Sequence, residues 1–532
     1  MDAYVLGLVA VLVLIVFKLG TRNHEYWRRK GVESVGAVPF VGSMWPVVSL
    51  REHMADFFHR LAIENKGKKF VGYFQVGYHT RKSVISRNQS RARTFQGSTP
   101  GLLVLDPELI RSILISDFSH FVDHGFEIDP EADPMQSRNL FNMSGQYWKE
   151  MRSMLSPTFS SGKIKALFPL VQECATSFEN YMLSNKSQDI NIKDLLARFT
   201  TNVIGSCAFG ITVNSLENPE DKFRQMGRKL FEVDFVQGFK NSCIFFQPQI
   251  ANIFKFRVFS EELTNFFRNL VHEIMDKRAK SGNTRKDFLQ LLIQLKEKGK
   301  LGSTDDEPNE NNESSIGLKL TDDDIVAQAL VFFIGGFEST SMTLTYTLME
   351  LARNPEAQRK ARANIKEVLQ RHDGILSFQS MQELTYLDKI ANETLRMYPP
   401  LAVINRICTK QYKIPNTNVT LEKGTAIAIS VKGIQNDPQY FEDPETFNPD
   451  RFSDENPVKT KCAFMPFGEG PRQCIGMRFA KMPLKLGLFS ILRHFEVLQS
   501  PNTVYPPEFD PRQFFLASKH DIYVQLRECC DY

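Results

Sequence analysis

Apolar residues recur at helical spacing along much of the chain, and the longest such stretch follows a typical helix start. Thr321 can cap a helix, and the aspartates at 322–324 lie where the positive end of a helix dipole favours negative charge. The apolar pattern continues to about Asn354, where Pro355 ends it. A helix of this length can cross the whole molecule. The pattern predicts further helices over 148–155 and 190–209.

A second apolar run, from Tyr4 to Phe17, is followed by basic residues. It is slightly shorter than the roughly 20 residues that span a bilayer. Because the positive charge follows the run, the pattern favours an uncleaved anchor over a cleaved secretory signal and keeps the bulk of the protein cytosolic. We predict an N-terminal membrane anchor over residues 1–20, a linker or hinge over 21–45 and one large domain over 46–532.

Two other stretches stand out by their composition. Residues 223–259 are rich in phenylalanine, with Phe231, Phe235 and Phe239 at four-residue spacing, and such a stripe belongs to a buried core in most proteins. Residues 302–317 are acidic and poor in apolar side chains, which predicts a solvated loop.

The overall composition narrows the functional classes. The chain has 532 residues, of which 42% are hydrophobic, and this suits a large core. Its formal charge of +4 is too close to neutral to suggest binding of nucleic acid. Eight cysteines occur without paired CxxC spacing, which argues against a zinc site and a disulfide scaffold and fits a reducing compartment.

The strongest chemical signal surrounds Cys474. Residues 467–476 read Phe-Gly-Glu-Gly-Pro-Arg-Gln-Cys-Ile-Gly, ahead of a helical stretch. A thiolate is a soft ligand for iron, the glycines free the backbone, and amides at the helix start stabilise negative charge. This segment resembles the cysteine loop of the cytochrome P450 family. The resemblance makes Cys474 the axial iron ligand, with Phe467, Arg472 and Gly476 matching the pattern; a buried structural cysteine is the alternative.

The long helix carries a second motif, Gly-Gly-Phe-Glu-Ser-Thr at 335–340, which resembles the family's oxygen-activation motif. Small residues would bring the helix close to a flat cofactor, and Glu338 beside the Ser339 hydroxyl would relay protons. The family commonly has threonine at the alcohol position, so Ser339 is a departure. Thr340 is the alternative alcohol, but it lies roughly 100° further around the helix, so we favour Ser339. A glycine pair that serves only helix packing is the plain structural alternative.

Three charged residues match the family's structural network. Glu393 and Arg396 lie on one helical face, and Arg451 lies in a segment that resembles the source of a second arginine. By resemblance these residues hold the cysteine-loop side of the fold in shape.

The propionates of haem need cationic or hydrogen-bonding partners. By resemblance these partners are Trp148, Arg152, Arg406 and Arg472. His124 lies where relatives often carry arginine, so it is a candidate to bind a propionate with a charge that depends on pH, but the favoured interpretation is a surface histidine.

The resemblance covers nearly the whole chain after the anchor. It implies a mainly α-helical fold with a small β subdomain, and haem b between the long helix and the cysteine loop. The chain is most similar to insect microsomal members that metabolise xenobiotics. The implied reaction is monooxygenation of a lipophilic molecule, such as an insecticide, a plant toxin, or an endogenous lipid or hormone. The implied location is the endoplasmic reticulum membrane, with the catalytic domain in the cytosol.

The same resemblance implies partners. The sequence contains no glycine fingerprint for a flavin or dinucleotide, so electrons from NADPH would come through NADPH–cytochrome P450 reductase, with cytochrome b5 as an optional donor. Lys461, Arg472 and Lys485 are candidates for a basic docking face, although charged residues often only solvate a surface.

The resemblance also implies a substrate cavity. Residues 223–259 would form its roof and dip into the membrane, which competes with the reading of this stretch as core. The implied substrate contacts are Phe337, Leu401, Ala402, Val403, Ile404, Phe514, Phe515 and Leu516.

Two other functions stay open. A haem-thiolate isomerase or dehydratase would rearrange oxygenated lipids without a reductase, and it would be active without NADPH. A non-enzymatic haem or lipophile-binding protein would bind its ligand and consume no NADPH.

Overall fold

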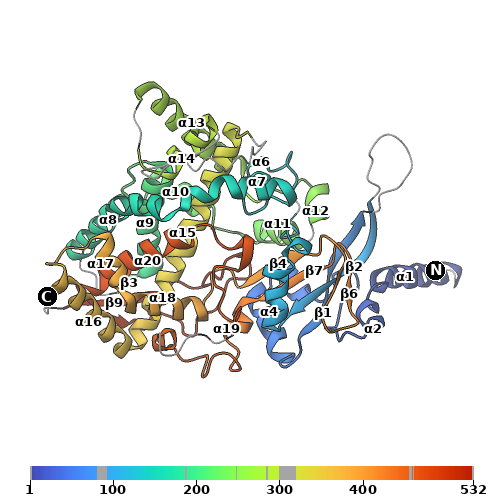
Figure 1. Cartoon of the computed structure of the whole chain (residues 1–532). Coiled ribbons are helices and arrows are strands. Elements are labelled where there is room, and N and C mark those ends of the chain that lie inside the picture. The colour runs from blue at the N-terminus through green and yellow to red at the C-terminus, as the bar shows by residue number, and fades with distance from the viewer. Residues whose placement is uncertain are drawn as a thin grey trace.

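The structure, a computed structural model, describes residues 3–80, 93–126, 128–185, 189–246, 248–282, 285–298, 319–453, 458 and 460–529. Helices make up most of it and strands a small part, which confirms the predicted fold class. The largest sheet lies at one end of the molecule, on the side of the N-terminal helix, while a smaller sheet with β3 and β9 lies among the helices at the other end, near the C-terminus (Figure 1). The loop predicted over 302–317 lies outside the described residues.

The helices of the described residues are α1 (Ala3–Thr21), α2 (Tyr26–Arg29), α3 (Trp45–Val48), α4 (Met54–Glu64), α5 (Pro107–Arg111), α6 (Pro134–Ser137), α7 (Gly145–Leu155), α8 (Ser161–Ser184), α9 (Ile192–Ile204), α10 (Lys222–Lys229), α11 (Phe235–Phe246), α12 (Pro248–Ile253), α13 (Glu261–Ser281), α14 (Phe288–Lys298), α15 (Asp322–Arg353), α16 (Pro355–Arg371), α17 (Phe378–Glu383), α18 (Thr385–Met397), α19 (Val431–Gln435) and α20 (Met477–Leu492). The strands are β1 (Phe70–Thr80), β2 (Arg93–Val104), β3 (Ile190–Asn191), β4 (Val403–Ile407), β5 (Tyr412–Lys413), β6 (Thr420–Leu421), β7 (Ala426–Ser430), β8 (Phe495–Gln499) and β9 (Tyr523–Glu528).

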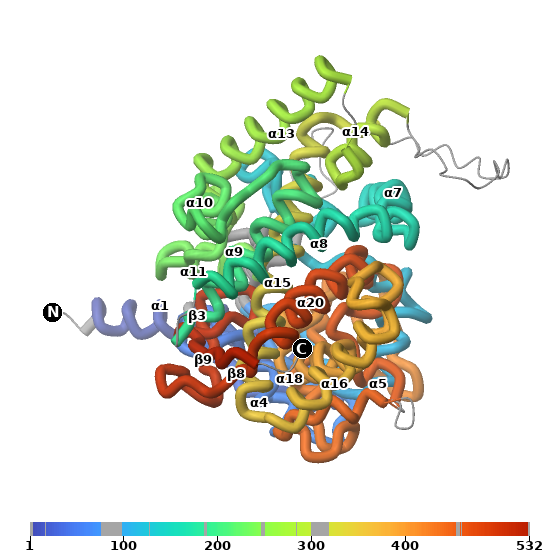
Figure 2. Tube along the Cα trace, turned by 90° about the vertical axis from the view of Figure 1, so that its left-hand side faces the viewer, coloured from blue at the N-terminus to red at the C-terminus, as the bar shows by residue number. Residues whose placement is uncertain are grey.

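Helix α15 is the predicted long helix. The Thr321 hydroxyl accepts a hydrogen bond from the Asp324 amide at 3.2 Å, and the Asp324 carboxylate accepts one from the Thr321 amide at 2.9 Å, so a capping box starts the helix. The helix ends at Arg353, and Pro355 opens α16. It packs against α9, α13, α18 and α20, and Figure 2 shows it between α9 and α20. It therefore forms the central axis of the helical part.

The two other helix predictions are confirmed with different ends. The helix predicted over 148–155 is α7, which begins three residues earlier at Gly145. In the stretch 190–209, the first two residues form β3, α9 follows, and a π-helical turn occupies 205–209.

The largest sheet has the strand order β1-β2-β7-β4. The β2–β7 pair is parallel, and the β1–β2 and β7–β4 pairs are antiparallel. Strand β7 lies between β2 and β4, and four of its five residues are buried. Through this pairing the N-terminal strands position β4, whose side chains reach the candidate site described below.

The predicted anchor forms an exposed helix. Within the described residues two helices are long and apolar enough to cross a membrane, α1 and α15, and α15 lies largely in the core. In contrast, α1 projects from the body in Figure 1, and Leu8 and Leu14 on it are 72% and 66% exposed. The linker predicted over 21–45 packs against the sheet, because Trp27 is fully buried and its Nε1 donates to the Tyr73 carbonyl at 3.1 Å.

The phenylalanine stripe divides between interior and surface. The rings of Phe231 and Phe337 lie 5.4 Å apart inside the molecule. Phe235 and Phe239, on α11, are 65% and 42% exposed. Packing in the core therefore accounts for only part of the stripe.

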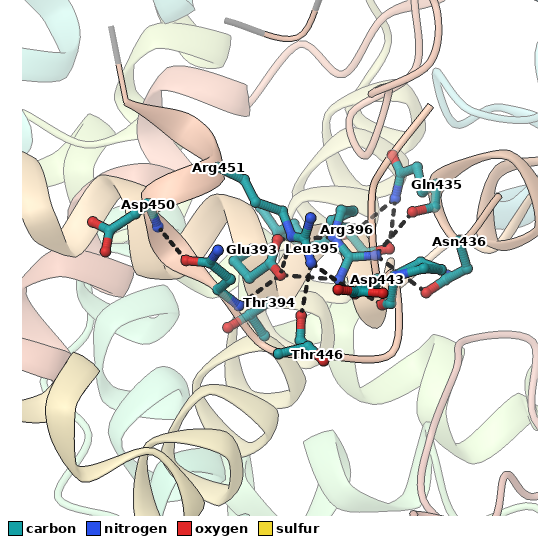
Figure 3. Close-up of polar contacts among 12 residues, drawn as sticks. Glu393, Thr394, Leu395, Arg396, Gln435, Asn436, Asp443, Thr446, Asp450 and Arg451 are labelled. Atoms are coloured by element: carbon teal, nitrogen blue, oxygen red, sulfur yellow. Dashed lines mark hydrogen bonds and ion pairs between the residues drawn. The ribbon is translucent and has the colours of Figure 1, made fainter. Parts of the chain in front are cut away.

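A buried charge network surrounds Glu393 on α18 (Figure 3). Arg396 donates from Nε and Nη2 to the two carboxylate oxygens of Glu393, at 2.8 and 2.9 Å. Arg451 donates from Nε to Glu393 Oε1 at 3.2 Å, and the Asn448 amide donates to the same oxygen at 2.9 Å. Glu393 and Arg396 are completely buried, so these bonds satisfy charges that water does not reach.

The same network extends to the cysteine loop through Gln435. Arg396 donates to the Gln435 backbone carbonyl at 2.9 Å, and the Gln435 side chain donates to the Leu395 and Arg396 carbonyls, each at 3.0 Å. The Gln435 Oε1 atom accepts a hydrogen bond from the Met465 amide at 2.9 Å. Met465 lies two residues before the cysteine loop begins, so a chain of hydrogen bonds joins α18 to that loop.

Substitution of Glu393 by alanine should destabilise the protein strongly. It leaves the buried guanidinium of Arg396 and the partly buried one of Arg451 without their carboxylate, and breaking a buried pair in this way costs about 3–5 kcal/mol. Unfolding in urea, followed by far-UV circular dichroism, measures the change. Glu356→Ala is the matched control, because Glu356 has the same three-residue spacing to Arg359 but on the exposed surface of α16. Equal effects of the two substitutions would contradict the buried network's role.

Candidate active site

One cavity of about 640 Å³ lies between α15, the cysteine loop and β4. Four segments far apart in the sequence meet at its wall: the loop over 124–142, α15, the segment 400–406, and the stretch 465–480. The loop over 513–515 and residues of α11 close it on another side. The cavity therefore brings together the segments in which the predicted site residues lie.

The cysteine loop needs glycine at two positions. Gly468 and Gly470 both have φ of +72°, in the left-handed region. A Cβ atom at Gly470 would lie 1.9 Å from the Leu114 carbonyl oxygen, so a side chain there is excluded. The Cys474 amide donates to the Phe467 carbonyl at 2.8 Å, which closes the loop, and both residues line the cavity.

The surroundings of Cys474 shift the pKa of its thiol in opposite directions. Burial raises its pKa, whereas a hydrogen bond from the Gly476 amide and the charge of Arg152 lower it. Gly476 is the N-cap residue of α20, so this amide lies at the positive end of that helix. A thiolate at this position has an amide and a guanidinium to stabilise it, which is the environment that a metal-binding cysteine requires.

Three arginines gather beside the cysteine loop. Arg472 donates to the Val122 carbonyl at 2.9 Å and to the Met143 carbonyl at 2.6 Å, and its guanidinium lies 4.0 Å from the centre of the Trp148 ring. Burial lowers the pKa of Arg472 to about 9 and that of Arg406 to about 10, and it also lowers the pKa of Arg152. The group therefore has an excess of positive charge and favours an anionic partner.

His124 lies inside this group rather than on the surface. Its ring stacks on Phe141 with 4.8 Å between centroids, and its Nδ1 lies 3.0 Å from Arg406 Nη1. Burial, followed by the charges of Arg406 and Arg472, holds the pKa of His124 well below its usual range. The ring is therefore neutral, and its Nδ1 also lies 3.2 Å from the Asn405 carbonyl oxygen. Because His124 lines the cavity, its interpretation as a surface histidine is wrong.

The residues present fit a haem group. Arg406 Nε is buried, and among the described residues it has no hydrogen-bond partner, so it leaves one donor directed at a missing acceptor. Trp148, Arg152, Arg406, Arg472 and His124 all line the cavity that Cys474 also lines. A thiol on one wall and several cationic donors beside it match an iron-containing group that carries carboxylates.

The glycine pair of α15 has two different environments. A Cβ atom at Gly335 would meet nothing within 4 Å, so this position keeps the cavity open. A Cβ atom at Gly336 would lie 2.4 Å from Ile204 Cδ1, so this glycine allows α15 to pack closely against α9. The two glycines therefore have different roles: Gly335 leaves space in the cavity, and Gly336 allows close helix packing.

The alcohols and the acid of α15 point in different directions. Ser339, Thr340 and Thr343 line the cavity, and the Ser339 hydroxyl donates to the Gly335 carbonyl one turn earlier. Glu338 instead lies near Lys193 and Arg224, on α9 and α10. Burial raises the pKa of Glu338 to about 7, although the two cations oppose that shift.

Five of the eight predicted substrate contacts lie on the cavity wall. These are Leu401, Val403, Ile404, Phe514 and Phe515. The other three are buried in the hydrophobic core: Phe337, Ala402 and Leu516. Phe337 stacks on Phe333 with 5.4 Å between ring centroids, because it lies on a different side of α15 from Ser339.

Sequence reasoning named Phe514 and placed Phe245 in the expected roof, but it missed Phe126 and Phe141 and the wall that these four rings form together. The Phe514 ring stacks on Phe245 at 4.4 Å, and it lies 6.3 Å from both Phe126 and Phe141. All four rings line the cavity, yet they come from three distant segments. Their spacing in the sequence carries no signal, because only the tertiary fold brings them together.

The predicted basic docking face is mostly absent from the surface. Lys485 is buried, where it donates to the Met381 carbonyl at 3.1 Å and pairs with Asp388 at 2.6 Å. The Arg472 side chain is only 2% exposed. Lys461 is exposed, so of the three residues it alone is available for docking.

Comparisons with known proteins agree with this geometry. The sequence model of the cytochrome P450 family matches residues 70–524. The chain is 35% identical to cytochrome P450 9e2 of Blattella germanica, over 98% of this chain and 97% of that protein. It is 36% identical to the probable cytochrome P450 6a13 of Drosophila melanogaster, over 97% of this chain and 98% of that protein.

The raised pKa of Glu338 predicts a pH-dependent cost in stability. Its carboxyl has a pKa of 4.5 in the unfolded chain and about 7 in the fold, so the cost is small below pH 4.5, grows as the pH rises and is complete above pH 7. The free energy of unfolding of Glu338→Gln, relative to wild type, should therefore rise by about 2 kcal/mol between pH 5 and pH 8. Urea titrations at the two pH values measure it. Glu356→Gln, on an exposed surface, should show no such rise, and a pH-independent difference for Glu338→Gln would contradict the assignment.

Proposed function

The chain belongs to the cytochrome P450 family of monooxygenases, and on this premise we propose that it oxidises lipophilic xenobiotics at the endoplasmic reticulum membrane. The observation that carries the proposal is the position of Cys474, on a glycine-constrained loop at the wall of a largely apolar cavity, beside three arginines. In the reaction a substrate RH, O2, NADPH and a proton become ROH, water and NADP⁺.

The haem, when bound, supplies the oxygen-activating chemistry, which thiolate ligation favours. The protein would hold it through Cys474 at the iron and through Trp148, Arg152, Arg406, Arg472 and His124 at the propionates. Arg406 Nε would gain the acceptor that it lacks among the described residues. The neutral imidazole of His124, beside Arg406, would add a further polar contact. Phe467 and Gly476 would shape the loop around the sulfur.

Protons would come from α15. A carboxyl with a pKa of about 7 holds and releases a proton readily at neutral pH, so Glu338 suits a relay. The Ser339 hydroxyl lies at the cavity, one residue along the helix, and would pass the proton on after it turns away from the Gly335 carbonyl. Thr340 also lines the cavity and is the alternative donor.

The cavity wall favours an uncharged, lipophilic substrate. Phe126, Phe141, Phe245, Phe514 and Phe515 present aromatic rings, which contact apolar and aromatic molecules favourably. Leu401, Val403 and Ile404 add aliphatic surface. The insect relatives support a foreign compound, such as an insecticide or a plant toxin, as the substrate, with endogenous lipids or hormones as the alternative.

Electrons would come from NADPH through NADPH–cytochrome P450 reductase, with cytochrome b5 as a second donor. The exposed apolar helix α1 would anchor the protein in the membrane, and the exposed phenylalanines of α11 would contact the same lipid surface. Both features support a microsomal location.

The reduced, carbon monoxide-bound difference spectrum of the membrane-expressed protein tests this function. We expect a thiolate-type Soret band that is lost in Cys474→Ala and kept in Cys462→Ala, since Cys462 is a buried cysteine of the preceding segment. Product formation that needs both reductase and NADPH then separates a monooxygenase from an isomerase and from a binding protein. A folded, haem-loaded wild type without the band would refute the ligand assignment.

Substitutions of Ser339 test the proton relay. Ser339→Ala should lower the product formed per NADPH by about tenfold and raise peroxide release, because a proton donor is removed. Ser339→Thr should retain or improve coupling. Ser341→Ala is the control, since the Ser341 hydroxyl is buried and donates to the Glu338 carbonyl. A fully coupled alanine variant would show that Thr340 or water delivers the proton.

A further inference from the structure

The loop that carries Phe514 and Phe515 is bound from outside by two buried side chains of distant elements. One is His53, which precedes α4, and the other is Tyr346, on α15. Each contacts a backbone carbonyl of the loop, at Phe515 and at Leu516 respectively. The two contacts fall on consecutive residues, directly beside the rings that enter the cavity.

His53 is fixed in one tautomer by its two neighbours. Its Nδ1 accepts a hydrogen bond from the Ala55 amide at 3.0 Å, as the N-cap of α4. The proton is therefore on Nε2, which donates to the Phe515 carbonyl at 3.2 Å. The side chain is 2% exposed, and burial lowers its pKa, so the ring is neutral.

Tyr346 holds the next carbonyl of the loop. Its hydroxyl donates to the Leu516 carbonyl at 2.7 Å, and its ring stacks on Tyr398 with 4.7 Å between centroids. The Leu516 amide donates to the Pro400 carbonyl at 3.0 Å, so Leu516 is bound on both sides. Pro400 directly precedes Leu401, which is also a residue of the cavity wall.

The rings of this loop are the point at which the aromatic wall closes. Phe514 contacts three other phenylalanines of the wall, and Phe515 lies 6.2 Å from Phe231. A change in backbone direction at 515–516 would turn both rings and alter the shape of the cavity. Fixing the two carbonyls therefore fixes two walls of the substrate space.

We propose that His53 and Tyr346 are specificity-determining positioning residues, which set the direction of the Phe514 and Phe515 rings through the backbone of their loop. The proposal rests on the function inferred above, because it takes the cavity to be the substrate site. Neither side chain would touch the substrate. They act by pre-organising the wall, and a displacement of about 1 Å in such a wall is enough to change binding of a bulky ligand greatly.

A purely structural role predicts a different result. Removing either side chain removes a buried hydrogen bond and so also costs stability, although the Phe515 carbonyl keeps a second donor, the Ala517 amide at 2.7 Å. A loss of stability alone would lower the affinity for all ligands of the iron by the same factor, or for none of them. A positioning role would instead lower the affinity only for ligands that are large enough to reach Phe514 and Phe515.

Two azoles separate these cases in the ferric, haem-containing full-length protein. Imidazole is small enough to bind the iron without reaching the loop, whereas clotrimazole carries three aryl rings and is bulky enough to be expected to contact Phe514 and Phe515. Spectral titration of the Soret band gives a Kd for each ligand without any catalytic turnover. The variants are Tyr346→Phe, which removes one hydroxyl, and His53→Asn, which keeps an N-cap acceptor but is too short to reach Phe515.

Tyr398→Phe is the matched control. It removes a buried hydroxyl from the ring stacked on Tyr346, but that hydroxyl donates to Glu350 rather than to the loop. We expect the Kd for clotrimazole to rise about fivefold in Tyr346→Phe and in His53→Asn, with the Kd for imidazole unchanged. Tyr398→Phe should change neither value.

The outcomes of this experiment are distinct. If the clotrimazole Kd stays at the wild-type value in the loop variants, or rises equally in Tyr398→Phe, the positioning role is refuted. If Tyr346→Phe does not fold, the clotrimazole Kd of His53→Asn, compared with those of the wild type and Tyr398→Phe, decides whether the positioning role holds. A wild-type protein that shows no azole-induced shift at all would refute the haem-thiolate function instead.

Discussion

The buried carboxylate of Glu393 accepts hydrogen bonds from Arg396, Arg451 and the Asn448 amide, and the geometry of the cysteine loop depends on this interaction. Through Gln435 the same network binds the Met465 amide, just before the loop. A charge without water must keep its partners, because an unpaired buried charge costs several kcal/mol. The network is therefore a rigid support, and the position of Cys474 at the cavity wall follows from it.

The second constraint is the separation of charge and apolar surface around one cavity. Three arginines and a neutral histidine lie near the cysteine loop, and phenylalanines line the adjoining part of the cavity wall, where Phe141 stacks on the histidine ring. Burial lowers the pKa of Arg406 and Arg472 because their charges are taken out of water. A carboxylate that binds there would stabilise these charges, so the region favours carboxylates. The aromatic wall offers no such donors from its rings. The cavity can thus hold an anionic cofactor on one side and an uncharged substrate on the other.

Helix α15 joins these two regions and adds the proton chemistry. Gly335 leaves the cavity open, and Gly336 lets the helix lie against α9. The adjacent acid and alcohol face different surroundings, since Glu338 lies toward α9 and α10 and Ser339 lies at the cavity. In this arrangement the Glu338 carboxyl, whose pKa is raised, lies on the side of α15 that faces α9 and α10. The Ser339 hydroxyl lies at the cavity wall. Tyr346, two turns further along the same helix, holds the loop that completes the wall.

The sequence by itself determined the local features. The Thr321 cap, the aspartates that follow it and the apolar period predicted α15, the glycines predicted a cysteine loop with a freed backbone, and motif resemblance gave the family. These features depend on residues that are near one another along the chain. Only the tertiary structure decided the burial of Lys485 and His124, the core position of Phe337, and the meeting of Phe126, Phe245 and Phe514. The reason is physical: whether a side chain lies in water, in the core or at a cavity depends on packing between distant elements, and that information is not contained in spacing along one segment.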